Sequence, residues 1–122
     1  MNIPNNLEYT RDHEWVKYND DSAIIGVTDF AQSELGDVIF MELPKIGDIF
    51  NEGDSIGTIE AVKTVADIYT PIKGEIIDIN DNLENNPELL NNDPYNKGWI
   101  IKISFSNKPK LLSSKEYAEM IK

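Results

Sequence analysis

The stretch that decides the fold runs from residue 59 to residue 71 and reads IEAVKTVADIYTP. Two short runs of β-favouring residues, 56–62 and 65–69, flank one central lysine, Lys63. Residues rich in Val, Ile and Tyr favour strands, and Pro71 and Gly74 close the segment. The pattern predicts two adjacent strands with a lone amine at the turn between them.

Other short strands are predicted on both sides of this stretch, at residues 13–18, 23–27, 38–43, 74–79 and 99–103. The polar residues 19–22 suit a hairpin loop. Within residues 74–79, alternation places Ile77 and Ile79 on one face and Ile76 and Asp78 on the other. Many short strands separated by turn signals predict a mainly β sandwich or barrel.

Helices are predicted to be few and short, and capping signals locate them. They cover residues 32–35, 88–91 and 114–121, with Thr28 or Asp29 and then Gly36 bounding the first, Asn86 before Pro87 opening the second, and a Ser113–Glu116 capping box opening the third. Tyr117, Met120 and Ile121 form the apolar stripe of the C-terminal helix. No linker rich in Gly or Ser interrupts the chain, which predicts a single domain over residues 1–122.

Composition excludes several classes of function. The net charge of −11 and the pI near 4.3 argue against nucleic acid and against anionic membrane surfaces. No apolar run approaches the roughly 20 residues that cross a bilayer, and no secretory signal is visible, so a cytoplasmic protein is expected. The chain has no Cys and one His, and it carries no GxSxG, phosphate-binding glycine loop or HExxH motif.

Two other motifs contain residue types that occur in functional sites. The acidic run at residues 78–84 resembles the opening of an EF-hand loop, but Leu83 and Leu89 stand where Gly and Glu are required. A solvated loop is therefore predicted here, and no metal site. In His13-Glu14-Trp15, strand geometry places the first and third side chains on one face and the acid on the other. The ordinary reading is a core Trp beside surface polar groups, and a functional role for Glu14 stays open.

Lys63 has an ordinary reading as a surface lysine at a hairpin. Three features favour a functional reading. The residues beside it have short side chains, the flanking strands hold the tip rigidly, and Glu60 and Asp67 mark the ends of the exposed stretch. The alternative to an ordinary surface lysine is therefore that the amine of Lys63 is selectively modified.

A family resemblance follows from motifs along the whole chain. EAVKTVADIYTPIKGEI resembles the lipoyl-lysine hairpin of the H protein of the glycine cleavage system, and YTRDHEWV, IGVTDFAQSELGDVIFMELPKIGD, PELLNNDPY and GWIIKI resemble the same family in the same order. The resemblance runs from about residue 7 to residue 121. It implies a lipoyl/biotinyl-type barrel-sandwich hybrid with a few short helices, one of them C-terminal.

The resemblance also implies a carrier rather than an enzyme, with lipoic acid in amide linkage to Lys63. Its partners would be a pyridoxal-phosphate glycine decarboxylase, a tetrahydrofolate-dependent aminomethyltransferase, a dihydrolipoamide dehydrogenase, and the lipoate ligase or lipoyl transferase that attaches the cofactor. Because the chain has no Cys, the dithiol must be imported on such a cofactor. An arm that visits three partners favours a monomer.

Two sets of residues are candidates for contact with the loaded lipoyl arm or with the enzyme that attaches it. The amine of a loaded aminomethyl group is cationic and needs shelter from water, and Glu14 and Asp67, with Asp12 nearby, are the acids that would receive it. Glu60, Val62 and Thr64 are the candidates for recognition by the lipoylating enzyme.

Three alternatives remain beside the carrier role. A biotin carrier shares the fold, but its lysine is flanked by methionines, where this chain has Val62 and Thr64. A lipoyl-relay protein, which donates lipoate to other complexes, has the same architecture. A binding module that kept only the fold would retain its function after Lys63→Arg.

Overall fold

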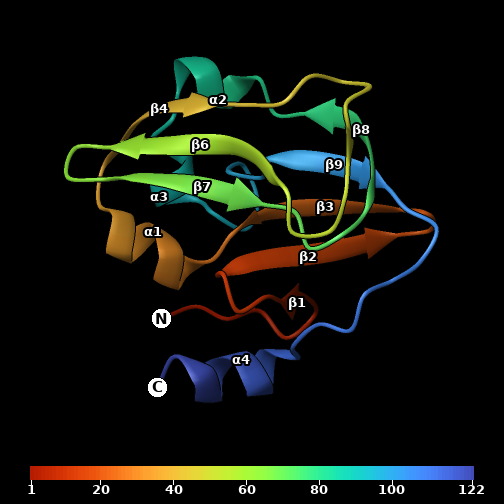
Figure 1. Cartoon of the computed structure of the whole chain (residues 1–122). Helices are drawn as coiled ribbons and strands as arrows, with labels where there is room; N and C mark the ends of the chain where they lie inside the picture. The colour runs from red at the N-terminus through yellow and green to blue at the C-terminus, as the bar shows by residue number, and fades with distance from the viewer.

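The chain folds into two antiparallel sheets, and the computed structural model describes all residues from Met1 to Lys122 (Figure 1). A six-stranded sheet has the order β1-β2-β3-β9-β8-β5, and a three-stranded sheet has the order β4-β6-β7. The strands are β1 Glu8–Tyr9, β2 Glu14–Asn19, β3 Ser22–Val27, β4 Val38–Glu42, β5 Ile49–Phe50, β6 Ser55–Ala61, β7 Val65–Tyr69, β8 Gly74–Ile79 and β9 Ile101–Ser104. The helices are α1 Asp29–Leu35, α2 Asn82–Asn85, α3 Leu89–Asn92 and α4 Ser114–Met120.

The main core lies between the two sheets and is built almost entirely from aliphatic side chains. Alternation sends one side chain in two inward from each strand. The six-stranded sheet contributes residues such as Ile25 and Ile76, and the three-stranded sheet contributes Met41, Ile59 and Ile68, all of them buried in one cluster. This shared core fixes the β6–β7 hairpin against the larger sheet.

The strand predictions are confirmed within a residue or two. The strand predicted at 65–69 is β7 and the one at 74–79 is β8, each with the expected bounds, and Gly36 ends α1 after Thr28 caps its start. The capping box of Ser113 and Glu116 is present at the start of α4. Strong local signals therefore located most elements correctly.

The predicted faces of β8 are wrong because of a β-bulge. The pairing of β8 with β9 shifts between Ile76 and Asp78, and a bulge sends two neighbouring side chains to one side of the sheet. Ile76 is buried in the core, Ile77 is exposed, and Ile79 packs partly against the same core as Ile76. Alternation alone does not reveal a bulge.

The acidic run at residues 78–84, expected to be a loop, contains the start of α2. Leu83 of this helix is buried in the core. Asn86, expected to cap the next helix, instead ends α2, and α3 begins at Leu89 with Glu88 as its N-cap. Two-residue strands β1 and β5 were also not predicted, since they carry too few residues for a pattern.

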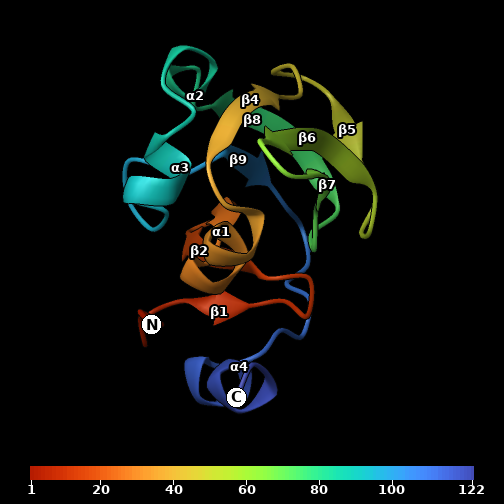
Figure 2. The ribbon, with the colours of Figure 1, turned by 90° about the vertical axis from the view of Figure 1, so that its left-hand side faces the viewer.

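The C-terminal helix covers a second, aromatic cluster. Tyr117 of α4 stacks on Tyr9 with ring centroids 4.7 Å apart, and Trp15 and Leu7 complete the buried group. Figure 2 shows α4 lying beyond β1, the edge strand of the large sheet, at the opposite end of the molecule from β6 and β7. No helix is long and apolar enough to cross a membrane.

Trp15 depends on the absence of a side chain at Gly26. The two residues are paired across β2 and β3, and a Cβ on Gly26 would lie 2.6 Å from the indole ring. Trp15 is buried and donates a hydrogen bond from Nε1 to the carbonyl oxygen of Pro94 at 3.0 Å. The ring therefore has little freedom to move away.

We expect Gly26→Ala to lower the free energy of unfolding by about 2 kcal/mol, because overpacking displaces a fixed aromatic ring. Urea denaturation followed by circular dichroism measures the change. Lys17→Ala, at an exposed position of the same strand pair, is the control and should stay within about 0.5 kcal/mol of the unsubstituted chain. Equal losses in the two variants would contradict the packing argument.

Candidate functional site

Lys63 lies at the exposed tip of the β6–β7 hairpin. The strands pair in register up to Glu60 and Val65, and the Ala61 N–H donates to the Thr64 carbonyl oxygen at 2.8 Å. Val62, Lys63 and Thr64 are all exposed. Figure 1 shows the tip at the edge of the molecule, on the same side as α1.

The tip is held against the corner between α1 and β4. The Val62 N–H donates to the Asp37 carbonyl oxygen at 3.0 Å. The stem of Lys63 lies over Gly36, where a Cβ would come within 3.1 Å of the lysine Cε. Gly36 also has a φ of 76°, which favours glycine. The lysine stem therefore crosses a position where glycine gives it room.

An outward-facing row of side chains runs along β7 away from the tip. Alternation along the strand places Val65, Asp67 and Tyr69 on its exposed side. Asp67 accepts hydrogen bonds from the hydroxyl groups of Ser55 and Tyr69, both at 3.4 Å. Lys63 lies in the turn, two residues before β7 begins, so at about 3.3 Å per residue the backbone span from Lys63 to Asp67 is at most roughly 13 Å.

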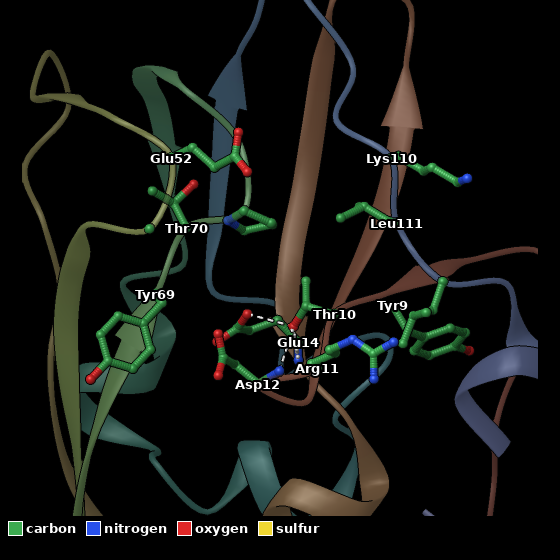
Figure 3. A pocket seen from close by; sticks show the side chains of 13 residues that line it. Tyr9, Thr10, Arg11, Asp12, Glu14, Glu52, Tyr69, Thr70, Lys110 and Leu111 are labelled. Carbon is green, nitrogen blue, oxygen red and sulfur yellow. Dashed lines mark hydrogen bonds between the residues drawn. The ribbon is translucent and has the colours of Figure 1, made fainter. Parts of the chain in front are cut away.

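A cavity of about 260 Å³ begins where this row ends. Tyr69 and Glu52 lie on one side of it, Arg11 and Lys110 on the other, and Glu14 lies between them (Figure 3). The cavity therefore collects charged side chains of both signs from segments far apart in the sequence.

Glu14 is the buried acid of this cavity. Its side chain is 3% exposed, and Oε1 accepts a hydrogen bond from the Thr10 hydroxyl group at 2.7 Å. The pKa of Glu14 is raised to about 8, and burial is the largest cause; the negative charge of Asp12 also raises the pKa, whereas the hydrogen bonds from Thr10 and the Tyr69 backbone lower it. At neutral pH this carboxyl group holds its proton, and a cation beside it would favour its release.

The structure brings some of the expected site residues together and separates others. Glu14 and Asp12 share the cavity. Asp67 does not line it, but it is hydrogen-bonded to Tyr69, which does. Glu60 is exposed on the hairpin, one residue before the buried Ala61.

The sequence does not reveal most of the cavity wall, and the prediction that Glu14 is a surface polar residue is wrong because its side chain is buried. Tyr69 was detectable, because alternation along β7 places it on the same side as Asp67. Thr10, Arg11 and Lys110 had no local signal. No group of three or more His, Cys, Asp or Glu side chains is arranged to hold a metal ion.

We expect Glu14→Gln to stabilise the protein at pH 8 and to have little effect at pH 4.5. The folded-state pKa is raised, so the stability associated with the protonated group is fully present below the unfolded pKa and is lost as pH rises toward 8. Glutamine keeps an acceptor for Thr10 and carries no titrating group, so the gain at pH 8 should be roughly 1–3 kcal/mol. Urea denaturation of the variant and the unsubstituted chain at pH 4.5 and pH 8 measures this gain. An equal difference in the free energy of unfolding at the two pH values would contradict the raised pKa of Glu14.

Comparisons with known proteins identify the family. A family model described as glycine cleavage H-protein matches residues 7–122. The glycine cleavage system H proteins of Listeria monocytogenes serotype 4a and serovar 1/2a are each 49% identical to this chain over 124 residues, which is 99% of the chain and 99% of each relative.

A solved structure agrees. The crystal structure of a glycine cleavage system H protein from Mycobacterium marinum superposes with a TM-score of 0.93 at 34% sequence identity, covering 98% of both chains. The expected architecture, two facing sheets with a few short helices including a C-terminal one, is confirmed by this match. The chain belongs to the glycine cleavage H-protein family, whose members are lipoyl carriers of the glycine cleavage system.

Proposed function

We propose that Lys63 carries lipoic acid in amide linkage and that the chain shuttles the aminomethyl group of glycine. The observation that carries the proposal is the placement of one lysine at an exposed hairpin tip whose backbone is hydrogen-bonded, with its stem over Gly36. The membership of the chain in the H-protein family supports the same assignment. The cofactor supplies the dithiol chemistry that a chain without Cys lacks.

Three enzymes would meet this carrier in turn. A pyridoxal-phosphate glycine decarboxylase loads the aminomethyl group, an aminomethyltransferase passes the one-carbon unit to tetrahydrofolate, and a dihydrolipoamide dehydrogenase restores the disulfide. Attachment to a flexible lysine stem raises the local concentration of the reacting group at each partner. The chain itself contributes binding surfaces and shelter rather than catalysis.

The hairpin also offers features by which a lipoylating enzyme would recognise it. Val62 is 72% exposed, and Glu60 and Thr64 are exposed beside it. The tip backbone is held through the Val62 and Ala61 amides, which leaves these side chains free for contact. We assign Glu60, Val62 and Thr64 to recognition by the lipoate ligase or lipoyl transferase.

The cavity would receive the loaded arm. An extended lipoyl-lysine side chain reaches about 14 Å by standard bond lengths, which covers the backbone span of at most roughly 13 Å from Lys63 to Asp67. The aminomethyl group extends this reach toward Tyr69 and the cavity. There the carboxyl group of Glu14 would release its proton to solvent and pair with the cationic amine, while Asp67 and Asp12 add negative charge at the entrance.

We expect the intact mass to increase by one lipoyl group after incubation with a lipoate ligase, ATP and lipoate. Lys63→Arg should show no increase, because arginine keeps the charge and length but offers no amine for the amide bond. An increase that persists in the variant would remove Lys63 from the proposal.

The same assay tests the recognition residues separately. Glu60→Gln should lower kcat/KM for lipoylation severalfold if this carboxylate is part of the recognised surface. Glu119→Gln makes the same change at an exposed position of α4, away from the hairpin, and is the matched control. Equal rates for the two variants would exclude Glu60 from recognition.

We expect the double substitution Glu14→Gln and Asp67→Asn to shorten the lifetime of the aminomethyl-loaded protein at least severalfold. Removing both acids takes away two of the negative charges that would hold the amine, so the arm spends more time in water. Release of ammonia from the isolated loaded protein measures the lifetime.

A matched control removes the same two charges elsewhere. Asp81→Asn with Glu84→Gln changes two exposed acids around α2 and should leave the lifetime unchanged. An unchanged lifetime in the Glu14 and Asp67 variant would exclude both residues from sheltering the arm.

A further inference from the structure

One side chain of α3 holds the corner on which the Lys63 hairpin rests. The Asn91 side chain donates from Nδ2 to the Gly36 carbonyl oxygen at 2.8 Å, and its Oδ1 accepts from the Val38 N–H at 2.9 Å. A third hydrogen bond runs from Nδ2 to Oε1 of Gln32 at 3.2 Å. Asn91 thereby joins α3 to both α1 and β4.

The corner needs a partner that donates and accepts at once. Gly36 follows the last turn of α1, where carbonyl groups lack intrahelical partners. Val38, two residues later, presents an N–H to the same side chain. Among neutral side chains, an amide offers a donor nitrogen and an acceptor oxygen side by side, and the opposite orientation of the amide would set donor against donor at Val38.

The residue between these two contacts carries the hairpin tip. Asp37 accepts the hydrogen bond from the Val62 N–H, and among residues 62–64 this is the only backbone hydrogen bond that leaves the hairpin. Gly36 lies under the Lys63 stem. All three residues of the corner, 36–38, therefore make contacts. Asn91 is hydrogen-bonded to Gly36 and Val38. The hairpin tip contacts Asp37 and Gly36.

We propose that Asn91 is a positioning residue for the Lys63 hairpin. Asn91 acts indirectly, by fixing the backbone of residues 36–38. In this conformation the Asp37 carbonyl oxygen accepts the hydrogen bond from the Val62 N–H, and Gly36 gives room to the lysine stem. The amine then has a defined place relative to the rest of the molecule. The effect of Asn91 on lipoylation rests on the proposed function, whereas the effect of Asn91 on the position of the hairpin does not.

Amide hydrogen exchange, followed by NMR, tests the effect on the hairpin. In Asn91→Ala, the Val62 amide should exchange about five- to tenfold faster, because the corner that supports its acceptor has lost its hydrogen bonds. The Ala61 amide, which donates within the hairpin to Thr64, should change by less than about twofold. Asn92→Ala alters the exposed neighbour in the same helix and should match the unsubstituted chain at both amides.

A second variant separates the contacts. Asn91→Asp keeps an acceptor for Val38 but loses the donor to Gly36, so it should resemble Asn91→Ala. Unchanged exchange at Val62 in Asn91→Ala would overturn the proposal, and so would an equal increase at Val62 and Ala61, which indicates general destabilisation. Wild-type exchange in Asn91→Asp would exclude the contact with Gly36.

Lipoylation kinetics then test the consequence. Asn91→Ala should raise KM for the protein substrate about threefold or more with little change in kcat, because a loosened tip must be ordered on binding. Asn92→Ala should change neither constant. If the unsubstituted chain accepts no lipoyl group on Lys63, the proposed function fails, while the exchange of Val62 still decides the role of Asn91. If Asn91→Ala speeds exchange at Val62 but leaves KM unchanged, the inference that tip position governs lipoylation is overturned.

Discussion

Packing of the three-stranded sheet onto the six-stranded sheet is the interaction on which the rest of the structure depends. Met41, Ile59 and Ile68 from the small sheet are buried in the same cluster as Ile25 and Ile76 from the large one. Full burial of each such side chain contributes roughly 1.5–3 kcal/mol. Because β6 and β7 are fixed by this core, their hairpin can extend to an exposed tip that has no core of its own.

The tip is held by backbone atoms, and this frees its side chains. Val62 is tied to Asp37 through its N–H, and Ala61 to Thr64 through backbone groups alone. The side chains of Val62, Lys63 and Thr64 all face solvent. A protein partner can therefore contact the side chains around the lysine without breaking the hydrogen bonds that hold it in place.

The burial of Glu14 lowers the stability of the fold when this carboxyl group is ionised, and it places an acid in the cavity. A carboxyl group with its pKa raised to about 8 is costly to keep ionised inside the fold. Residues with perturbed pKa values are concentrated at functional sites. The net charge of −11 adds to this cost, since like charges repel in a compact chain. Arg11 and Lys110 supply positive charge on one wall of the cavity.

The sequence by itself determined the seven longer strands, the capped ends of α1 and α4, the position of Lys63 between two strands, and the family. These features depend on neighbouring residues: alternation along 65–69, a glycine after a helical turn, and a Ser113–Glu116 box. Each is a local rule that one segment obeys without reference to the others.

Only the tertiary structure decided how the site is enclosed. Glu14 is buried because β2 begins beside the end of β7, and the bulge near Ile76 appears only when β8 is paired with β9. Asn91 is hydrogen-bonded to Gly36 and Val38, which lie 55 and 53 residues before it in the sequence. Side-chain pattern specifies which face of an element is apolar, but the neighbours of a carboxyl group or an amide depend on where the elements meet, and desolvation and hydrogen bonding act through those neighbours.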